Sequence, residues 1–416
     1  MKVAIIGAGI SGLAVALILN DKFEVHLFES DPRLGGHANT VNVQDNESGN
    51  VAVDTGFLVY NTLTYPHFTK FLDYLGVESV ESDMTLSIQT KDGIEWGGEN
   101  LKTIFAQRRN LFRPSFLRML LDIVRFNRNA GENLRLSIKN NWTLGELVDF
   151  LKCNESFKNH YLLPMTGAIW SMSYENALKF PAETFLTFCI NHRLLQINDR
   201  PIWRTIKGGS INYVNRVFDK LERVHLGTKV TAIRKKPNSI GVLTPNSEID
   251  FDKVILATHA PTSKKIIQND FPELAKEIAC FDVTTNQVVL HGDRSVMPKT
   301  ELCWSAWNVL AQGKANSNEE ISLTYYINKL QPLNSKKNYF VTLNGKNDFA
   351  STHLKLHYDH PQFNFQAIEA QKRLPDIQGT EGIFFAGAWT RYGFHEDGIL
   401  SAVNVAKLMG VVPPWI

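Results

Sequence analysis

Three glycines and one acid near the N-terminus have the types and spacing needed to bind a dinucleotide. Gly7, Gly9 and Gly12 form a G-x-G-x-x-G motif, and Glu29 follows 22 residues after Gly7. The first glycine permits a tight turn, the second lets the backbone approach a pyrophosphate, and the third lets a helix pack closely on a strand. The acid accepts hydrogen bonds from a ribose diol and repels the extra phosphate of NADP. The contacts expected from this segment are Gly7, Gly9, Ile10, Ser11, Gly12, Glu29 and Ser30.

The elements around the motif are those that such a site requires. Residues 2–6 form a short apolar run that predicts a buried parallel strand, residues 13–19 predict a helix, and residues 23–28 predict a second strand. A phosphate beyond the first strand would meet the free N–H groups and the positive dipole end of the helix. Glycines at fixed places favour this strand and helix over a signal peptide. The unit alone does not distinguish NAD from FAD.

The segment that follows the second strand separates these two cofactors. Residues 31–40 read DPRLGGHANT. An acid, a short loop, two glycines and a nearby threonine resemble the flavin amine oxidase superfamily, which includes amine oxidases, phytoene desaturases, protoporphyrinogen oxidases and flavin-dependent mutases. The resemblance implies FAD rather than NAD, and it adds Gly35, Gly36 and His37 to the expected contacts.

Four further blocks follow in the order that the same superfamily shows. They are residues 53–57 (VDTGF), 207–210 (KGGS), 230–261 (beginning at Val230 and ending in FDKVILATHAP) and 382–390 (GIFFAGAWT) with Gly398 beyond. In the last block the superfamily has a strand entering a helix whose N-terminus faces the isoalloxazine ring. The resemblance implies further FAD contacts at Thr55, Gly56, Phe57, Val230, Ala257, Gly387, Ala388, Trp389, His395, Asp397, Gly398 and Ile399.

The spacing of these blocks predicts an α/β fold with a discontinuous FAD domain. A chain of 416 residues is too long for one ordinary core, so we expect two joined domains. The blocks assign residues 1–80, 206–262 and 376–416 to a Rossmann-type FAD-binding domain. Residues 81–205 and 263–375 would form an inserted, mixed α+β substrate domain, as in amine oxidases, with the pocket between it and the flavin.

Three departures from the superfamily pattern bear on the chemistry. His37 stands where many relatives have an arginine against the pyrophosphate, and it either gives weaker charge compensation or is a structural residue with one satisfied hydrogen bond. Amine oxidases often hold a lysine near flavin N5, but the region expected for it has Trp304 and Trp307, with only Lys299 nearby. The stretch 323–381 contains no cysteine. We therefore expect non-covalent FAD and disfavour amine oxidation.

A narrower resemblance suggests the substrate. The segments GGHANTV and FAGAWTRYGFHEDG resemble a bacterial branch of predicted FAD/NAD-binding oxidoreductases whose genes often lie beside those of cyclopropane fatty-acid synthase-like enzymes. This association implies an apolar, fatty-acyl or lipid substrate. We therefore expect hydride transfer at flavin N5. A non-redox flavin-dependent isomerase and a non-catalytic flavin-binding partner of a lipid-modifying enzyme are the alternatives.

Polar groups near the ring are candidates for proton transfer. They are Tyr60, His395 and Glu396, the last two in the HEDG segment. The alternative for this segment is that Asp397 caps the helix N-terminus beside the flavin and no proton moves.

Composition excludes several other classes. The net charge of +2 does not indicate a nucleic-acid partner, and 44% hydrophobic with 21% charged residues is ordinary for a globular protein. The four cysteines form no CxxC pair, which predicts reduced thiols and no metal site. Since no apolar stretch reaches the roughly 18 residues of a membrane span, we expect a cytoplasmic protein. The sequence does not indicate an oligomeric state.

Residues 108–135 are unusually basic. They contain seven arginines and only two acids, with apolar residues at near-helical spacing at Phe116, Leu117, Leu120, Leu121, Ile123, Val124 and Phe126. Such a helix either lies on an anionic membrane, here the inner membrane face, or packs on its own domain with a solvated basic side. The aromatic segments 161–170 and 180–188 either line a lipid-sized tunnel or belong to the core.

Overall fold

A parallel sheet built from three distant parts of the chain forms the centre of the lobe that contains the N-terminus. The computed structural model describes residues 1–196, 200–311, 321–345 and 348–416. The sheet has the order β10-β2-β1-β14-β20, and each neighbouring pair is parallel. Its strands are β1 (Lys2–Ile6), β2 (Glu24–Phe28), β10 (Val224–His225), β14 (Lys253–Leu256) and β20 (Ile383–Phe385). The predicted βαβ unit and Rossmann-type sheet are confirmed.

Alternating side chains of these strands bury both faces of the parallel sheet. Val3 and Ile5 face one core, whereas Ala4 and Ile6 face another. The first core is covered by α1 (Ile10–Leu19), α2 (Pro66–Leu75), α11 (Ile211–Phe218) and α16 (His395–Leu408). The second is covered by the antiparallel strands β11 (Ala232–Lys235), β12 (Ile240–Leu243) and β13 (Glu248–Phe251) with α12 (Ala260–Ile267), α13 (Pro272–Glu277) and α15 (Phe365–Ile377).

The helices α13 and α15, most of which lie in the predicted range 263–375, pack on the parallel sheet. Leu274 of α13 and Leu374 of α15 share a core with Ile6 of the parallel sheet. These helices therefore cover the sheet that carries the dinucleotide segment, and the predicted domain ranges stay a prediction. Composition does not change at these positions, and the apolar face of each helix is covered only in the tertiary structure.

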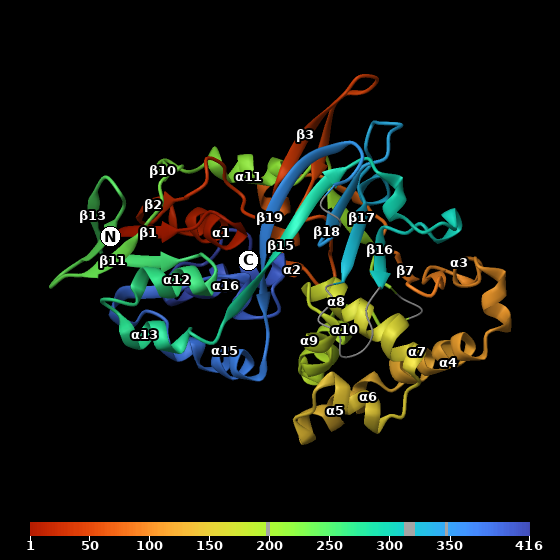
Figure 1. Ribbon diagram of the computed structural model, residues 1–416. Coiled ribbons are helices and arrows are strands. Elements are labelled where there is room, and N and C mark those ends of the chain that lie inside the picture. Colours follow the sequence, from red (N-terminus) through yellow and green to blue (C-terminus); the bar gives the residue numbers. More distant parts are fainter. Residues whose placement is uncertain (197–199, 312–320, 346–347) are drawn as a thin grey trace.

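A mixed seven-stranded sheet forms the middle of the molecule (Figure 1). Its order is β19-β15-β18-β17-β16-β7-β8, and only β16 and β7 pair in parallel. Its strands are β7 (Leu86–Thr90), β8 (Glu95–Gly97), β15 (Asp282–His291), β16 (Trp307–Ala311), β17 (Ser322–Tyr326), β18 (Phe340–Leu343) and β19 (Thr352–Gln362). The smaller elements beside it are the hairpin β3 (Thr40–Asp45) and β4 (Gly49–Asp54), the sheet of β5 (Tyr60–Asn61), β9 (Trp203–Ile206) and β6 (Ser79–Glu81), and α14 (Ile327–Leu330).

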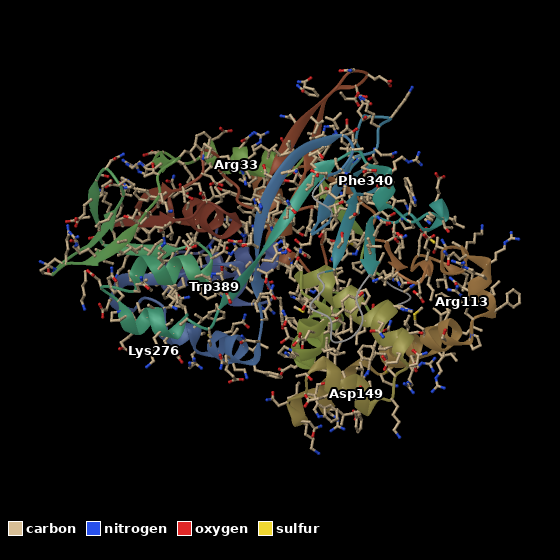
Figure 2. All side chains as sticks on the ribbon, viewed as in Figure 1. Arg33, Arg113, Asp149, Lys276, Phe340 and Trp389 are labelled. Carbon is tan, nitrogen blue, oxygen red and sulfur yellow. The ribbon has the colours of Figure 1, made fainter. Side chains whose placement is uncertain are left out.

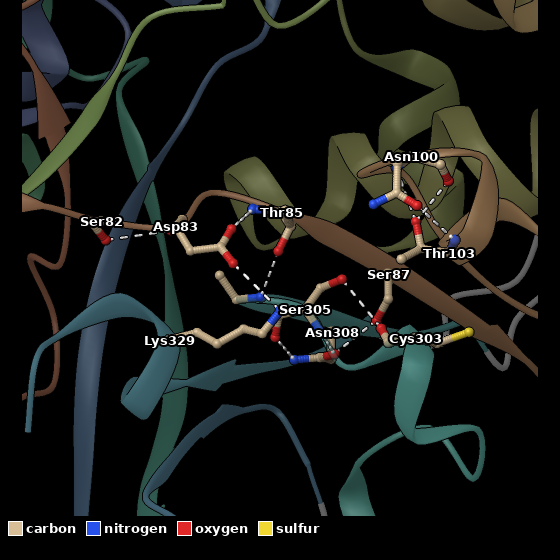
Figure 3. Close-up of polar contacts among 11 residues, drawn as sticks. Ser82, Asp83, Thr85, Ser87, Asn100, Thr103, Cys303, Ser305, Asn308 and Lys329 are labelled. Atoms are coloured by element: carbon tan, nitrogen blue, oxygen red, sulfur yellow. Dashed lines mark hydrogen bonds and ion pairs between the residues drawn. The ribbon is translucent and has the colours of Figure 1, made fainter. Parts of the chain in front are cut away.

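Polar side chains fix the parallel pair β7–β16 (Figure 3). Ser87 Oγ donates to Asn308 Oδ1 at 2.8 Å, and the Ser305 amide donates to the same oxygen at 2.9 Å. Asn308 returns a hydrogen bond from Nδ2 to the Ser305 carbonyl at 2.6 Å. The Trp307 amide donates to the Thr85 carbonyl at 2.9 Å. These bonds set the register that pairs Trp307 with Leu86 and so direct the Trp307 side chain.

A layer of helices lies beyond this sheet, at the lower right of Figure 1. It contains α3 (Leu101–Ile104), a 3₁₀ turn (Arg108–Phe112), α4 (Pro114–Arg128), α5 (Ala130–Asn140), α6 (Leu144–Phe150), α7 (Glu155–Phe157), a π turn (Lys158–Leu162), α8 (Leu163–Trp170), α9 (Tyr174–Lys179) and α10 (Ala182–Asn191). Buried aromatic side chains from α4, α7, α8 and α10 form one core against β7 and β16. Among the described residues, no helix combines the length and apolarity needed to cross a bilayer.

His291 on β15 is held in its neutral form. Its Nε2 lies 2.8 Å from Thr342 Oγ1, the Asp293 amide donates to its Nδ1 at 3.1 Å, and its ring stacks on Phe349. Burial lowers its pKa from 6.5 to about 4. Because this folded-state pKa lies below the unfolded value, its contribution to stability is complete above about pH 6.5 and is lost as the pH falls towards 4.

Replacing His291 by glutamine should flatten the pH dependence of stability. The free energy of unfolding of the wild type and of H291Q can be measured in urea at pH 7, 6 and 5. Between pH 7 and pH 5 the wild type should lose about 1–2 kcal/mol more of this free energy than H291Q does. The matched control is H357Q, because His357 is exposed on the neighbouring strand β19. The prediction would be contradicted if the difference between the two free energies of unfolding stayed constant over this pH range.

Candidate functional site

A cavity of about 480 Å³ opens at the carboxyl edge of the parallel sheet. One wall follows the ends of β1, β2, β14 and β20, and the other is made by α8, α10 and the seven-stranded sheet. The carboxyl ends of parallel strands are where ligands of open α/β sheets bind. The cavity therefore lies between the predicted dinucleotide segment and the aromatic residues of α8, α10 and the seven-stranded sheet.

The turn after β1 is a backbone cradle that only glycines permit. Gly7 has φ +101°, and its amide donates to the Phe28 carbonyl at 2.8 Å. A Cβ on Gly12 would lie 1.8 Å from the Gly7 oxygen, whereas a Cβ on Gly9 would meet nothing within 4 Å. Gly12 is thus needed for the fold, and Gly9 faces open space in the cavity. No side chain caps the N-terminus of α1, so its first amides are available to a phosphate.

Glu29 is held at the end of β2 by the same turn. Its Oε2 accepts from the Ala8 amide at 2.7 Å, and its Oε1 accepts from the Asp31 amide at 2.9 Å and from Ser30 Oγ at 3.1 Å. The carboxylate lines the cavity and keeps further lone pairs for a ribose diol. Thr228, Lys229 and Val230 form the adjacent wall.

Two loops close against this cradle through backbone contacts. The Gly35 amide donates to the Ala8 carbonyl at 2.9 Å, and the Phe57 amide donates to the His37 carbonyl at 2.8 Å. A Cβ on Gly56 would lie 2.3 Å from the His37 oxygen. These glycines therefore let three chain segments meet without side chains between them.

Three histidines gather beside the glycine cradle. The rings of His259 and His360 lie 5.8 and 5.6 Å from that of His37, and all three residues line the cavity. Burial lowers the pKa of each, that of His360 to about 4, so the rings are neutral at pH 7. Nε2 of His37 is buried and has no partner, which disfavours the interpretation of His37 as a structural residue with a satisfied hydrogen bond. In the described part of the chain no group of histidines, cysteines and acids has metal-binding geometry.

His395 is the candidate for proton transfer that reaches the cavity. Its ring stacks on Phe57 with centroids 3.6 Å apart and planes at 12°, and its Nε2 lies 3.2 Å from Tyr213 Oη. Burial lowers its pKa to about 3. The imidazole is therefore a neutral hydrogen-bonding group and not a reservoir of protons at pH 7.

The structure does not bring Glu396 or Tyr60 to the cavity wall, which corrects their expected position beside the ring. The Glu396 carboxylate accepts from the amides of His67 and Phe68 at 3.0 and 2.9 Å and so caps the N-terminus of α2. Tyr60 Oη donates to Ser79 Oγ at 2.8 Å within a buried aromatic cluster. Neither partner lies near in sequence, so the HEDG motif alone could not indicate the capping of α2.

Asp397 adopts the helix-capping geometry that was its alternative. Its Oδ2 accepts from the Phe394 amide at 3.0 Å at the start of α16. Burial raises its pKa to about 7, and Arg391 Nη1 lies 3.8 Å from its other oxygen. The carboxyl group therefore orients the helix that begins beside the cavity.

The cavity wall contains most of the residues expected to hold a dinucleotide. They are Gly7, Gly9, Ile10, Ser11, Glu29, Ser30, Gly35, Gly36, His37, Gly56, Phe57, Val230, Ala257, Gly387, Ala388, Trp389 and His395. Gly12, Thr55, Asp397, Gly398 and Ile399 lie behind this wall. They support it: a Cβ on Gly398, for example, would lie 2.7 Å from Ile10 Cγ2 at the crossing of α1 and α16.

The other half of the wall is apolar and aromatic, and most of it was not predicted. Its residues are Met84, Ile169, Trp170, Phe188, Leu194, Trp203, Trp307, Tyr325, Phe363 and Phe394. Of the segments 161–170 and 180–188, only Ile169, Trp170 and Phe188 reach the cavity, and the rest is mostly core. The aromatic content of these segments was a signal, but it did not show which side chains face inward.

Charged groups are scarce in this wall. Among the described residues that line it, Glu29 is the only carboxylate and Lys229 the only lysine, and both lie at the glycine-turn end. Trp307 lies in the wall, whereas Lys299 and Trp304 do not. The Trp304 ring instead packs against Tyr326 and Arg294.

The fold is that of several solved enzymes. The CLA-producing fatty acid isomerase from P. acnes matches with a TM-score of 0.69 at 12% identity over 98% of both chains. Cyclohexylamine oxidase from Brevibacterium oxydans matches with a TM-score of 0.70 at 16% identity over 98% of this chain and 99% of that one. Putrescine oxidase matches with a TM-score of 0.68 at 14% identity over 99% of both. At these identities the likeness shows the fold alone.

Sequence comparison identifies the family. No curated protein matches the chain. The model of the family described as flavin containing amine oxidoreductase matches residues 10–327, which is more than half of the chain. With this match and the geometry of the glycine cradle, the chain belongs to the flavin-containing amine oxidoreductase family, and its cofactor is FAD.

Proposed function

We propose that this protein is an FAD-dependent oxidoreductase that acts on an apolar substrate of the fatty-acyl or lipid class. The observation that carries the proposal is the division of one cavity into two halves. A glycine cradle with free amides and a carboxylate forms one end, and a continuous aromatic wall forms the other. A hydride donor or acceptor bound at the first end would meet a substrate held at the second.

The residues fit FAD for physical reasons. Gly9 leaves open the space that a pyrophosphate needs, the uncapped start of α1 offers its amides, and Glu29 offers carboxylate lone pairs to a ribose. When bound, FAD supplies transfer of a hydride equivalent at N5. The chain itself contributes position, polarity and the exclusion of water by the aromatic wall.

The wall favours a neutral apolar substrate over an amine. Burying a cationic amine without an opposite charge is costly, and the described residues of the aromatic half offer no carboxylate. Trp307 and Phe363 supply apolar surface there. His395 lines the cavity and its Nε2 lies 3.2 Å from Tyr213 Oη, and we propose that this neutral imidazole orients bound groups.

A non-redox isomerase is the second candidate. It is favoured by the fold match to the CLA-producing fatty acid isomerase, since isomerisation changes a fatty acid without net oxidation. The two candidates differ in one measurable quantity. An oxidoreductase consumes an electron acceptor in proportion to product, whereas an isomerase forms product without consuming any.

Replacing Gly9 should separate cofactor binding from folding. G9V should keep a native unfolding transition, because Gly9 has φ −70° and open space at its Cβ, but it should lose nearly all FAD, since the valine would occupy the pyrophosphate position. The readouts are flavin absorbance per protein and thermal unfolding. The control is G131V, a helical glycine whose Cβ would also meet nothing within 4 Å. A yellow G9V protein with full FAD content would refute the assignment.

FAD affinity should fall as the pH rises. In the protein without FAD, the imidazole rings of His37, His259 and His360 are neutral. The charged groups near them are Arg33 and Asp359, and His395 also lies close by. A bound pyrophosphate would raise the pKa of these rings, so binding takes up protons and is stronger at low pH. Titration of apoprotein with FAD should give an affinity about tenfold higher at pH 6 than at pH 8.

The variant H37Q should reduce this pH dependence, whereas H291Q, which changes a residue outside the cavity wall, should leave it unchanged. Calorimetry in buffers of different ionisation enthalpy would measure the proton uptake directly. Equal FAD affinity at pH 6 and pH 8 in the wild type would show that these histidines do not meet the cofactor's charge.

The substrate class can be tested on the flavin itself. Anaerobic mixing with fatty-acyl compounds or lipids should bleach the flavin band, and turnover should consume an acceptor. I169N, which places an amide in the aromatic wall, should lower kcat/KM for such a substrate about tenfold while FAD content stays normal. I138N on exposed α5 is the control. Bleaching by amines and not by lipids would overturn the proposal, and product formation without acceptor consumption would establish the isomerase.

A further inference from the structure

The helix α4 buries only one of its two apolar sides. Phe116, Met119 and Phe126 lie in the core of the helical layer and are at most 1% exposed. Leu117, Leu121 and Val124 are 38%, 71% and 44% exposed. The single apolar side expected from the sequence is therefore divided, and the three residues at i, i+4 and i+7 form a row that faces away from the core.

Arginines lie beside this exposed row. At 100° per residue, Arg118 and Arg125 form an adjacent row, and Arg128 follows at the end of the helix. We call Leu117, Arg118, Leu121, Val124, Arg125 and Arg128 the outer face of α4. Immediately before the helix, Phe112 is 85% and Leu111 44% exposed. Figure 2 shows Arg113, the residue that joins these two parts, at the outer edge of the helical layer.

The charge of this region is almost uncompensated. Residues 108–128 contain six arginines and one carboxylate, Asp122, which is buried and paired with Arg125 at 2.9 Å. The nearby acids Glu132 and Asp149 pair with Arg135 and Lys158. In the part of the chain that the structure describes, no ion pair involves Arg108, Arg113, Arg118 or Arg128. Such a surface attracts anions and repels a second copy of itself.

Exposed leucines bordered by arginines have the chemistry of a surface that enters a lipid interface. The apolar row can insert among acyl chains, while the arginine heads stay at the level of anionic headgroups. Each such arginine near an anionic bilayer contributes roughly 1 kcal/mol, so no single residue is needed for attachment. Leu121 is 71% exposed, and Phe112, just before the helix, is 85% exposed, so apolar exposure in this region is not confined to a single residue.

We propose that the outer face of α4, with Leu111 and Phe112, is a docking surface for an anionic phospholipid bilayer. The proposal deepens the function given above, because the core behind α4 also contains Trp170 and Phe188, which line the cavity. A protein docked by this layer would take apolar substrate from the bilayer. The docking itself requires neither turnover nor a particular substrate.

Vesicle flotation tests the surface on the intact FAD-loaded protein. The wild type should bind phosphatidylglycerol vesicles and bind pure phosphatidylcholine vesicles at least tenfold less, and high salt should weaken the former. R118Q should weaken binding about fivefold, and L121E should weaken it more than tenfold. The controls are K276Q, on the opposite lobe (Figure 2), and L408E, which changes a 60% exposed leucine on α16. Both should bind like the wild type.

Several results would overturn this proposal. They are equal binding to the two vesicle types, no binding at all, or variants of α4 that bind like the controls. Light scattering that shows a wild-type dimer and an L121E monomer would instead assign the face to a second copy. Flavin bleaching by detergent-dispersed lipid, measured on the same preparations, reports on the proposed function independently. Loss of vesicle binding with intact bleaching therefore separates the two failures.

Discussion

The site depends on backbone segments that touch without side chains between them. Gly12 lies against Gly7, Gly56 lies against the His37 carbonyl, and the Gly35 amide bonds to Ala8. Each contact would be lost with any larger residue, because a Cβ would lie within 1.8 to 2.4 Å of a backbone oxygen. The polar end of the cavity is consequently made of peptide groups, whose positions are fixed by the sheet and do not depend on rotamers.

A second constraint holds these loops in place from behind. Asp54, at the end of β4, is buried, and its carboxylate accepts from the amide and hydroxyl of Ser210, from Thr40 Oγ1 and from Gln331 Nε2. Burial raises its pKa while these bonds oppose the shift. One side chain thus joins the β3–β4 hairpin, the start of α11 and the segment after α14. The loop with Gly56 and Phe57 follows Asp54 directly, so the hydrogen bonds of Asp54 also hold this part of the cavity wall in place.

Local patterns predicted the fold and the cofactor end of the site, and tertiary contacts decided the rest. The spacing of Gly7, Gly9, Gly12 and Glu29 predicts a turn between a strand and a helix from nearby residues alone. By contrast, Glu396 caps α2 across more than 300 residues, a pairing that no local signal contains. The same holds for aromatic residues: the sequence of the run 180–188 does not distinguish Phe188 in the cavity from buried Phe185.

The helical layer shows why apolar content alone is ambiguous. Residues 114–128 have more apolar positions than one buried side can use, and the structure buries Phe116 and Phe126 while it exposes Leu121. Leaving such side chains in water forgoes roughly 1.5–3 kcal/mol for each one that burial would stabilise. Folding gains nothing from that arrangement. Burial of Leu121 requires a further apolar phase at this face, and the proposed bilayer would supply one. The aromatic cavity wall and the exposed row of α4 belong to opposite sides of the same layer, which is the arrangement expected where an apolar molecule must pass from a bilayer to a buried redox centre.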